Sequence, residues 1–306
     1  MNYDLPVAVS TRGLRQTLAD AIALTKPKVV ALLLLTTAAA MFVTPKGMPS
    51  FGLVVVTMLG GYLMAGGANA VNMAYDADID KVLSGRTRLR PTAAGRVSPG
   101  AALAFGLVLA ALAFGILAVF VNVLTAALAL VGFVYYAVLY TMVLKRSTPH
   151  NIVIGGGAGA VPALVGWAAM MNGLDLTAFA LFAIVFMWTP PHFWALALMQ
   201  TRNYAAAHVP MLPVVAGESE TQRQIWVYTL IMLAVTLVPV AFGMFGLVYL
   251  AGAVLAGAVF VWRAWRVRVD HTREAALKLY LYSMAYLALL FGAMVVDGIA
   301  SRALAG

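Results

Sequence analysis

The sequence predicts an all-α membrane protein in which nine helices cross the bilayer. Hydrophobic residues make up 63% of the 306 residues and charged residues only 10%, and the mean hydropathy is +0.93. Soluble domains carry about 25% charged residues. A helix needs about 20 apolar residues to cross about 30 Å of hydrocarbon. Nine such runs are separated by charged or Gly/Pro-containing breaks: 27–45, 51–72, 99–118, 121–143, 151–171, 176–199, 224–242, 244–263 and 276–297.

Residues 1–24 precede the first run. They contain Asp4, Pro6 and Asp20 and no long apolar core. We therefore expect a short N-terminal segment suited to the membrane interface and not a cleavable signal peptide. The whole chain, 1–306, is predicted to form a single membrane domain.

The positive charges predict the orientation. With the N-terminus placed in the cytoplasm and the loops alternating, 18 of the 20 Lys and Arg residues fall on the cytoplasmic side. Lys46 and Arg302 alone fall on the other side. This bias supports an odd number of helices, a cytoplasmic N-terminus and a C-terminus on the opposite side.

The net charge of +9 therefore has a topological explanation and adds attraction to anionic lipids. It does not require nucleic acid as a partner, and we expect none. The chain has no cysteine, which excludes disulfides, thiolate metal sites and cysteine nucleophiles.

Acidic residues gather at the end of the second apolar run, in Asn72-Met-Ala-Tyr-Asp76-Ala-Asp78-Ile-Asp80. On a helix, Asn72, Asp76 and Asp80 share one stripe, because each step of four residues drifts by only about 40°. Carboxylate and amide oxygens suit Mg2+ together with substrate phosphate. The stripe, which we call the acidic stripe (Asn72, Asp76 and Asp80), predicts a metal and diphosphate site at the membrane surface.

A second interpretation is open for the same residues. The carboxylates can pair with the basic residues of the following loop, which are Arg86, Arg88, Arg90 and Arg96. The asparagine at the first position is not needed for such a network. Asp78 lies about 200° from Asp76 on a helix, and we expect it to face solvent or form an ion pair.

A glycine-rich segment, 155–160, has two interpretations as well. It can be a phosphate-binding loop, or it can let a neighbouring helix approach closely. No Lys-Ser/Thr follows it, as a Walker A loop requires, so helix packing is favoured. Gly66 and Gly67 are interpreted in the same way.

The motif Asn72-X3-Asp76-X3-Asp80, followed by Arg86-Thr-Arg88-Leu-Arg90-Pro91, resembles the UbiA superfamily of intramembrane prenyltransferases. Further runs narrow the resemblance to its protoheme farnesyltransferase branch, the heme O synthases. These runs are collinear over the first seven helices. They are Leu24-Thr-Lys-Pro27, Ala68-Asn-Ala-Val-Asn-Met-Ala-Tyr-Asp-Ala-Asp-Ile-Asp80, Leu144-Lys-Arg-Ser-Thr-Pro149, Asn151-Ile-Val-Ile-Gly-Gly156, Trp188-Thr-Pro-Pro-His-Phe-Trp194 and Pro210-Met-Leu-Pro-Val-Val-Ala-Gly217.

The resemblance implies nine helices around a central cavity that opens to the cytoplasm. It also implies that the protein lies in the inner membrane of a bacterial-type cell. It implies Mg2+-dependent transfer of farnesyl from farnesyl diphosphate to a vinyl group of heme b, which gives heme O and diphosphate. Heme b is then a substrate and not a cofactor. Membrane lipids are expected partners, and a complex with a heme A synthase is open.

The candidate site residues follow from these motifs. Arg88 and Arg90 are expected beside Asn72, Asp76 and Asp80 in the catalytic site, where they would form charge-assisted bonds to phosphate. The remaining candidates are expected to bind substrate: Lys145, Arg146, Asn151, His192, Arg202, Asn203 and Tyr204. The resembling proteins usually carry Asp where this chain has Asn203, which shifts the expected metal site toward the acidic stripe.

His192 follows Pro190 and Pro191 inside a spanning segment, where an ionisable residue is functional by default. It can bind heme iron, accept a proton or bind a heme propionate, and we favour contact with heme. His150 is a weaker candidate, and His208 and His271 are expected in exposed loops. Aromatic residues could stabilise an allylic cation through cation–π attraction, and the candidates are Tyr135, Tyr136, Trp188, Phe193 and Trp194.

Two other functions are open. One is a prenyltransferase that acts on a quinone precursor or a chlorophyll-type acceptor. The other is a secondary transporter, in which broken helices and intramembrane carboxylates also occur. A transporter should carry its coupling residues near the middle of the membrane, whereas Asp76 and Asp80 are predicted at its cytoplasmic edge.

Overall fold

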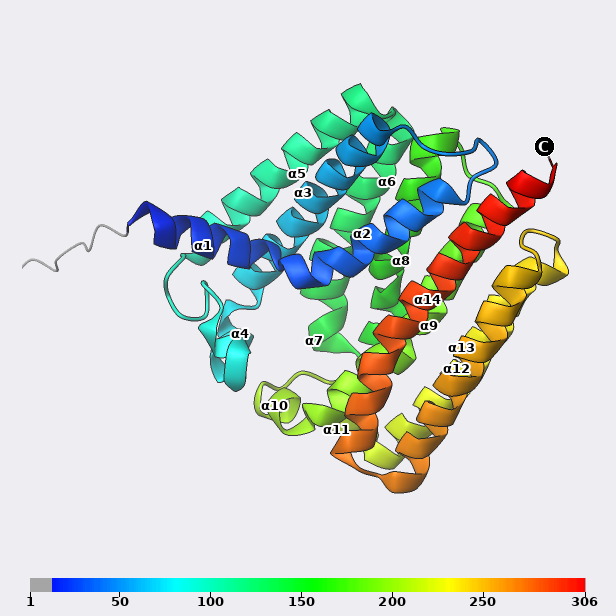
Figure 1. Ribbon diagram of the computed structural model, residues 1–306. Helices are drawn as coiled ribbons and strands as arrows, with labels where there is room; N and C mark the ends of the chain where they lie inside the picture. The colour runs from blue at the N-terminus through cyan, green and yellow to red at the C-terminus, as the bar shows by residue number, and fades with distance from the viewer. Residues whose placement is uncertain (1–12, 306) are drawn as a thin grey trace, which may run out of the picture.

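The computed structural model describes residues 13–305, apart from the side chains of Arg86, Leu304 and Ala305, and these residues form helices and no strand. Figure 1 shows the long helices side by side in one bundle. Their bounds are α1 Leu14–Thr25, α2 Pro27–Phe42, α3 Phe51–Tyr75, α4 Ala77–Val82, the 3-10 helix η1 Gly85–Leu89, α5 Pro99–Phe120, α6 Val123–Val134, the π-helix η2 Tyr135–Leu144, α7 Lys145–Ser147, α8 Asn151–Met171, α9 Leu176–Met199, α10 Thr201–Ala206, α11 Leu212–Val215, α12 Gly217–Ala241, α13 Leu247–Asp270 and α14 Arg273–Ala305.

Each of the nine predicted apolar runs contains a helix. Within residues 13–305, eight helices are long and apolar enough to cross a membrane. The first run, 27–45, contains only the 16-residue helix α2, which is about 24 Å long at 1.5 Å per residue. The fourth run is interrupted by η2, a feature that apolar composition does not reveal.

Polar caps fix where several spans begin. Asn122 accepts a hydrogen bond from the backbone N of Thr125, and Asp175 accepts one from that of Ala178. Ser98 caps α5 in the same way and is followed by Pro99. Side-chain oxygens at these positions satisfy backbone N–H groups that have no partner within the helix.

The predicted polar loops lie at one end of the bundle. Figure 1 shows α4, α10 and α11 together at the lower end and the C-terminus at the other end. At this other end, Arg302 donates hydrogen bonds to the carbonyl oxygens of Phe42 and Thr44. The two polar loops thus share one end of the bundle and the C-terminus lies at the other, while the side of the membrane that each end faces stays a prediction.

Helix α1 exposes an apolar stripe on one side. Leu14, Leu18 and Ile22 are all exposed, and their spacing of four residues puts them on one face. Asp20 is buried and pairs with Arg96 at 2.9 Å. An apolar face of this kind is typical of helices that lie in a membrane interface. Residues 1–12 of the predicted N-terminal segment, including Arg12, lie outside the described residues.

The glycines act in helix packing, as favoured above. A Cβ at Gly67 would lie 2.6 Å from the backbone oxygen of Gly106, so α3 and α5 cross in direct backbone contact. In α8, a Cβ at Gly155 would lie 2.4 Å from the ring of Tyr140, and one at Gly157 would lie 2.8 Å from the hydroxyl of Tyr135. Segment 155–160 is therefore a contact surface within the bundle.

The crossing of α3 and α5 yields a testable prediction. Gly106→Ala should lower the free energy of unfolding by about 1–3 kcal/mol, because the new methyl group would overlap backbone atoms of α3. Gly115→Ala in the same helix meets nothing within 4 Å and should change that free energy by less than about 1 kcal/mol. Thermal unfolding in detergent measures both. Equal effects of the two variants would contradict the close crossing.

Candidate functional site

The acidic stripe lies where α3 passes into α4. Asp76 ends α3 with φ −86° and ψ 8°, yet the helical hydrogen bonds continue across this residue. The backbone N of Asp76 donates to the oxygen of Asn72 at 2.9 Å, and that of Asp80 donates to the oxygen of Asp76 at 2.8 Å. The four-residue periodicity is kept, so the three side chains share one face. All three residues are buried.

Each residue of the stripe contacts a cation. Lys26 donates to Asn72 Oδ1 at 2.7 Å, and Lys145 donates to Asp76 Oδ2. Arg90 donates from one nitrogen to both oxygens of Asp80 at 2.8 Å. We call Lys26, Arg90 and Lys145 the three site cations. They come from three separate segments, the α1–α2 turn, the residue after η1 and the start of α7.

The ion-pair interpretation is thus correct for Asp80, whose partner is Arg90. It is not correct for Arg96, which pairs with Asp20 instead. Arg88 is exposed and forms no ion pair with any residue of 13–305. Arg88 and Arg90, which were equal candidates in the sequence, therefore differ in position: Arg90 contacts the acidic stripe and Arg88 does not.

The π-helix η2 supplies a partner for Asn72. Thr141 donates a hydrogen bond to the carbonyl oxygen of Tyr136, five residues earlier, at 2.8 Å. Its hydroxyl accepts one from Asn72 Nδ2 at 3.1 Å. Lys145 lies four residues after Thr141, one turn further along the same side. A π-helical turn contains an extra residue and rotates the side chains after it about the helix axis, and here the rotation turns both residues toward the stripe.

Burial and charge alter the protonation of this cluster. Burial lowers the pKa of Lys26 to about 7, and the charges of Arg90 and Lys145 contribute to this lowering. Burial also raises the pKa of Asp80, which the charge and hydrogen bonds of Arg90 oppose. Both shifts have the same origin, because a charged group loses hydration in a buried site.

Asp78 points away from the stripe, as expected. It forms two hydrogen bonds with Arg146 at 2.8 and 2.9 Å, and its side chain is 64% exposed. These hydrogen bonds lower the pKa of Asp78. Arg146 also donates to the backbone oxygen of Tyr75 and lies over its ring. Arg146 thus holds the α3–α4 junction, and its distance to Asp76 Oδ1 is 3.8 Å.

The second polar loop divides between two places. Burial raises the pKa of the Tyr204 phenol, with smaller effects from the charges of Arg90, Asp76 and Asp80. The Tyr204 hydroxyl is therefore neutral, and its ring packs against the hydrophobic core. Asn203 instead bonds Gln200 and accepts a hydrogen bond from Ser84 at 2.9 Å.

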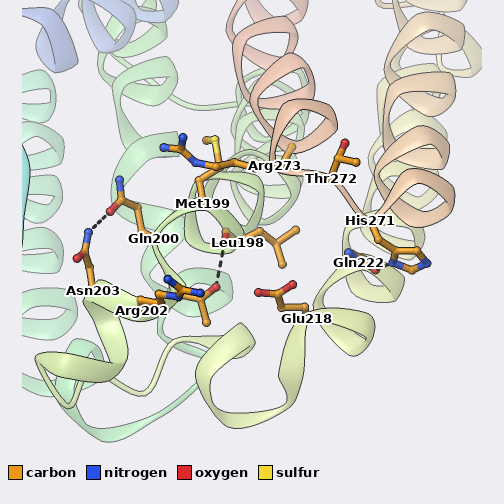
Figure 2. A pocket seen from close by; sticks show the side chains of 12 residues that line it. Leu198, Met199, Gln200, Arg202, Asn203, Glu218, Gln222, His271, Thr272 and Arg273 are labelled. Carbon is orange, nitrogen blue, oxygen red and sulfur yellow. Dashed lines mark hydrogen bonds between the residues drawn. The ribbon is translucent and has the colours of Figure 1, made fainter.

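Arg202 and Asn203 line a separate polar cavity of about 420 Å³. Figure 2 shows Arg202, Glu218 and Arg273 around it. No residue of the acidic stripe is among the lining residues, which come from the end of α9, α10, the start of α12 and the α13–α14 turn. His271 lies at this turn and bonds Gln222 at 2.6 Å.

Asn151 and the aromatic candidates lie in different surroundings. Asn151 is fully buried at the start of α8 and donates to the backbone oxygen of Thr148 at 2.7 Å. Tyr136 stacks on Tyr140 at 5.5 Å. Tyr135 instead bonds the oxygen of Ile154 on the outer side of α8, and Trp194 packs against Tyr228.

His192 is buried in α9 and contacts α14. Its ring lies between those of Trp188 and Tyr280, and its Nδ1 lies 2.6 Å from Ser283 Oγ. No ion pair connects it to a carboxylate in the described part of the chain. His208 and His271 are exposed, as expected.

The acidic stripe fits a hard divalent cation. Asp76 Oδ1 is buried and accepts no hydrogen bond from the groups that the structure describes. The same residues contain no group of three or more His, Cys, Asp or Glu side chains placed to hold a metal. Two carboxylates and an amide oxygen match Mg2+, because this ion binds through one or two carboxylates plus substrate phosphates.

Sequence reasoning gave no role to Lys26 or Thr141. A signal for Lys26 existed in the run Leu24-Thr-Lys-Pro27. The residue adopts a left-handed conformation with φ 50°, which is uncommon for a side chain other than glycine, and this turn directs it to Asn72. No sequence signal marks Thr141, because its direction depends on η2.

Comparisons with known proteins identify the family of the chain. Residues 33–290 match the model of the UbiA prenyltransferase family. The chain is 54% identical over 296 residues to a protoheme IX farnesyltransferase of Chloroflexus aurantiacus, with 95% of this chain and 50% of that protein covered. It is 50% identical over 278 residues to a protoheme IX farnesyltransferase of Nostoc sp., with 90% and 87% covered. The chain spans about half the length of the curated relatives it matches first.

Solved structures share the fold at low sequence identity. A digeranylgeranylglyceryl phosphate synthase has a TM-score of 0.75 at 16% identity, with 93% of this chain and 99% of that chain covered. A UbiA homolog from Archaeoglobus fulgidus bound to GPP and Mg2+ has a TM-score of 0.60 at 15% identity, with 90% and 99% covered. From the matched family model and the relatives covered over most of their length, the chain belongs to the UbiA prenyltransferase family.

Proposed function

We propose that this protein transfers the farnesyl group of farnesyl diphosphate to a vinyl group of heme b, which gives heme O and diphosphate. The observation that carries the proposal is the buried acidic stripe with its three site cations. Two carboxylates, an amide oxygen and three basic side chains in one place suit a metal–diphosphate and little else in an apolar bundle. The archaeal relative of the same fold bound to GPP and Mg2+ supports this assignment.

The residues act first on the leaving group. When bound, Mg2+ would neutralise the charge that develops on the departing diphosphate. Asn72, Asp76 and Asp80 would hold the ion. Arg90 and Lys145 would turn their donors to phosphate oxygens, where charge-assisted bonds are strong in a site of low dielectric.

The bond between the first farnesyl carbon and oxygen then breaks, and its electron pair leaves with diphosphate. The allylic cation adds to the vinyl group, and water supplies the hydroxyl group of the product with release of one proton. Tyr136 and Tyr140 stack on each other in η2, the helix whose Thr141 contacts Asn72, and their rings can stabilise a cation. Tyr204 remains a neutral hydroxyl that can donate to diphosphate.

Heme b is the proposed acceptor because of the names of the related proteins. Eight curated relatives at 48 to 54% identity carry the name protoheme IX farnesyltransferase. Within the chain, the segment Trp188–Trp194 with His192 provides a buried imidazole suited to a porphyrin, and Asn151 lies at the start of the neighbouring helix α8.

The protein is an integral membrane protein, and we propose the following orientation. The end with α4, α10 and α11 faces the cytoplasm of a bacterial cell, in its inner membrane, and the C-terminus lies on the opposite side. The distribution of Lys and Arg supports this choice. A heme A synthase in the same membrane is a suitable partner, because heme O is poorly soluble in water, and co-purification would test the contact.

Purified protein in detergent, incubated with heme b, farnesyl diphosphate and Mg2+, tests the function. We expect a heme that carries the hydroxyethylfarnesyl group, detected by mass analysis of the extract. Treatment with EDTA should abolish its formation, since the charge on the leaving group would not be neutralised. Readdition of Mg2+ should restore it.

Other outcomes would contradict the proposal. Formation of product at an unchanged rate in EDTA would exclude the metal role. Unchanged heme, together with prenylation of a quinone precursor or a chlorophyll-type acceptor, would keep the diphosphate site and replace the acceptor. No transfer to any acceptor by folded protein would favour the transporter instead.

A further inference from the structure

The side chain of Arg96 joins two separate segments of the chain. Its Nε donates a hydrogen bond to Asp20 Oδ1 of α1 at 2.9 Å, and its Nη2 donates one to the backbone oxygen of Leu89 at 3.0 Å. A guanidinium group carries its N–H donors in a fixed, planar arrangement, so the two acceptors are held relative to each other. Leu89 ends η1 and directly precedes Arg90.

The backbone after Arg90 is anchored as well. Thr92 Oγ1 donates to the backbone oxygen of Met73 in α3 at 2.9 Å. The chain then folds back on itself, because the backbone N of Arg96 donates to the oxygen of Pro91 at 2.9 Å. Arg90 thus lies between one anchor on α3 and one on α1.

The anchor on α1 has a defined position. Thr25, the last residue of α1, contacts the hydroxyl of Tyr62 at 2.8 Å, and its backbone oxygen accepts a hydrogen bond from Asn69 at 3.2 Å. A Cβ at Gly66 would lie 3.0 Å from the side chain of Thr25, so α1 ends in close contact with α3. Asp20 is buried in the same helix, and its carboxylate is therefore fixed relative to α3.

The pair of Asp20 and Arg96 is better suited to fix a position than to stabilise the fold. Asp20 is 3% exposed, and the hydration that a buried carboxylate loses offsets much of its attraction to a cation. Arg96 also has no contact with the acidic stripe among the side chains that the structure describes. Its effect on the site must therefore pass through the backbone that it holds.

Arg90 is a residue for which such a hold matters. It directly follows η1, its own backbone is extended, and its Nη1 donates to both oxygens of Asp80 at 2.8 Å. A long side chain loses conformational entropy when it is held in one place, and a fixed backbone leaves fewer alternatives to exclude. Misplacement of a substrate-binding group by about 1 Å can lower a rate by about 100-fold.

We propose that Asp20 and Arg96 are positioning residues for Arg90. Asp20 fixes the guanidinium group of Arg96, and this group holds the backbone oxygen of Leu89. Arg90 is thereby placed opposite Asp80, where its donors can turn to a phosphate. The proposal rests on the proposed function for the role of Arg90 in binding diphosphate.

The proposal makes α1 a part of the diphosphate site. Lys26 directly follows α1 and donates to Asn72 at 2.7 Å, so the positions of two of the three site cations depend on this helix. Figure 1 shows α1 at the edge of the bundle, and its exposed apolar face is typical of helices in a membrane interface. A helix suited to the membrane surface is thereby connected to the acidic stripe.

Asp20→Asn in the full-length protein in detergent tests the proposal, because asparagine keeps the shape of the side chain and leaves no buried charge. We expect the affinity for inorganic diphosphate with Mg2+, measured by calorimetry, to fall by about tenfold or more. In the Arg90→Gln variant, the same substitution should change this affinity by less than about twofold, because the side chain that Asp20 positions is already absent.

Two further variants separate positioning from loss of an ion pair. Arg96→Lys keeps a positive charge opposite Asp20, but one nitrogen replaces the two that contact Asp20 and Leu89. It should weaken diphosphate binding about as much as Asp20→Asn. Asp270→Asn is the matched control, because it breaks an ion pair with Arg266 that is also 2.9 Å long. It should leave the affinity within about twofold of native.

Thermal unfolding provides a measurement that needs no ligand. If Asp20 holds Arg90 against Asp80, the falls in unfolding temperature caused by Asp20→Asn and Arg90→Gln should be less than additive in the double variant. A structural role of Asp20 that is independent of Arg90 predicts additive falls.

Three results would overturn the proposal. They are an unchanged diphosphate affinity in Asp20→Asn, an equal loss of affinity in the native and Arg90→Gln backgrounds, and additive falls in unfolding temperature. The proposed function fails separately. In that case the native protein would bind no diphosphate or form no farnesylated heme, while the unfolding temperatures would still connect Asp20 with Arg90.

Discussion

Asp76→Ala should reduce farnesyl transfer to heme by about a thousandfold or more. Asp76 occupies the middle of the acidic stripe, is fully buried, and has one oxygen without a hydrogen bond in the described chain. Loss of this carboxylate would remove the central ligand of the proposed metal site. The rate of product formation at saturating farnesyl diphosphate, heme and Mg2+ measures the effect.

Removal of Asp76 also leaves Lys145 buried without its partner, which can cost about 3–5 kcal/mol of stability. The double variant Asp76→Ala with Lys145→Met removes the uncompensated charge and should fold more stably than Asp76→Ala while remaining inactive. Asp78→Ala is the matched control, because Asp78 is exposed, and its activity should stay within about tenfold of native. A folded double variant with near-native activity would disprove the metal role of Asp76.

Arg90→Gln should lower kcat/KM for farnesyl diphosphate by about 100-fold or more, whereas Arg88→Gln should lower it by less than about tenfold. Both arginines lie in the same basic segment. Only Arg90 reaches the stripe, with both oxygens of Asp80 at 2.8 Å, while Arg88 is exposed. Steady-state kinetics with varied farnesyl diphosphate compares the two variants directly.

Arg90→Lys provides a test of geometry. It keeps the charge but not the planar guanidinium that can bind phosphate through two nitrogens, so its activity should fall between native and Arg90→Gln. A thermal unfolding curve for each variant shows whether Asp80 without a partner has destabilised the protein. If Arg88→Gln proved as damaging as Arg90→Gln, diphosphate would have to bind further out, near η1.

Much of the fold follows from local chemistry that the sequence displays. The apolar runs and the helix caps are visible within short stretches of sequence; the caps are Ser98, Asn122 and Asp175. The glycine-rich segment 155–160 could be assigned to helix packing because no Lys-Ser/Thr follows it. The stripe was predictable for the same reason, because Asn72, Asp76 and Asp80 lie on one short piece of helical backbone. The helical hydrogen bonds continue across the end of α3 at Asp76, so residues four apart still lie on the same face.

The rest depends on contacts between distant segments. Nothing in the sequence of the basic loop distinguishes Arg90 from Arg88. The position of the end of η1 relative to α4 determines which arginine contacts Asp80. Lys26 reaches Asn72 across 46 positions and Lys145 reaches Asp76 across 69. The π-helical turn that directs Thr141 has no local sequence signature. Arg202 and Tyr204 have different surroundings because of how α10 packs against the bundle.

The three site cations affect the order in which ligands bind. Lys26, Arg90 and Lys145 already occupy oxygens of the acidic stripe, so a metal ion that arrives alone displaces them without offering a new anionic partner. A diphosphate provides that partner. Affinities for metal and for diphosphate should therefore be positively coupled, each ligand raising the affinity for the other by the same factor. When diphosphate leaves, we expect the cations to return to Asn72, Asp76 and Asp80, and we expect the protein to have little affinity for free metal between turnovers.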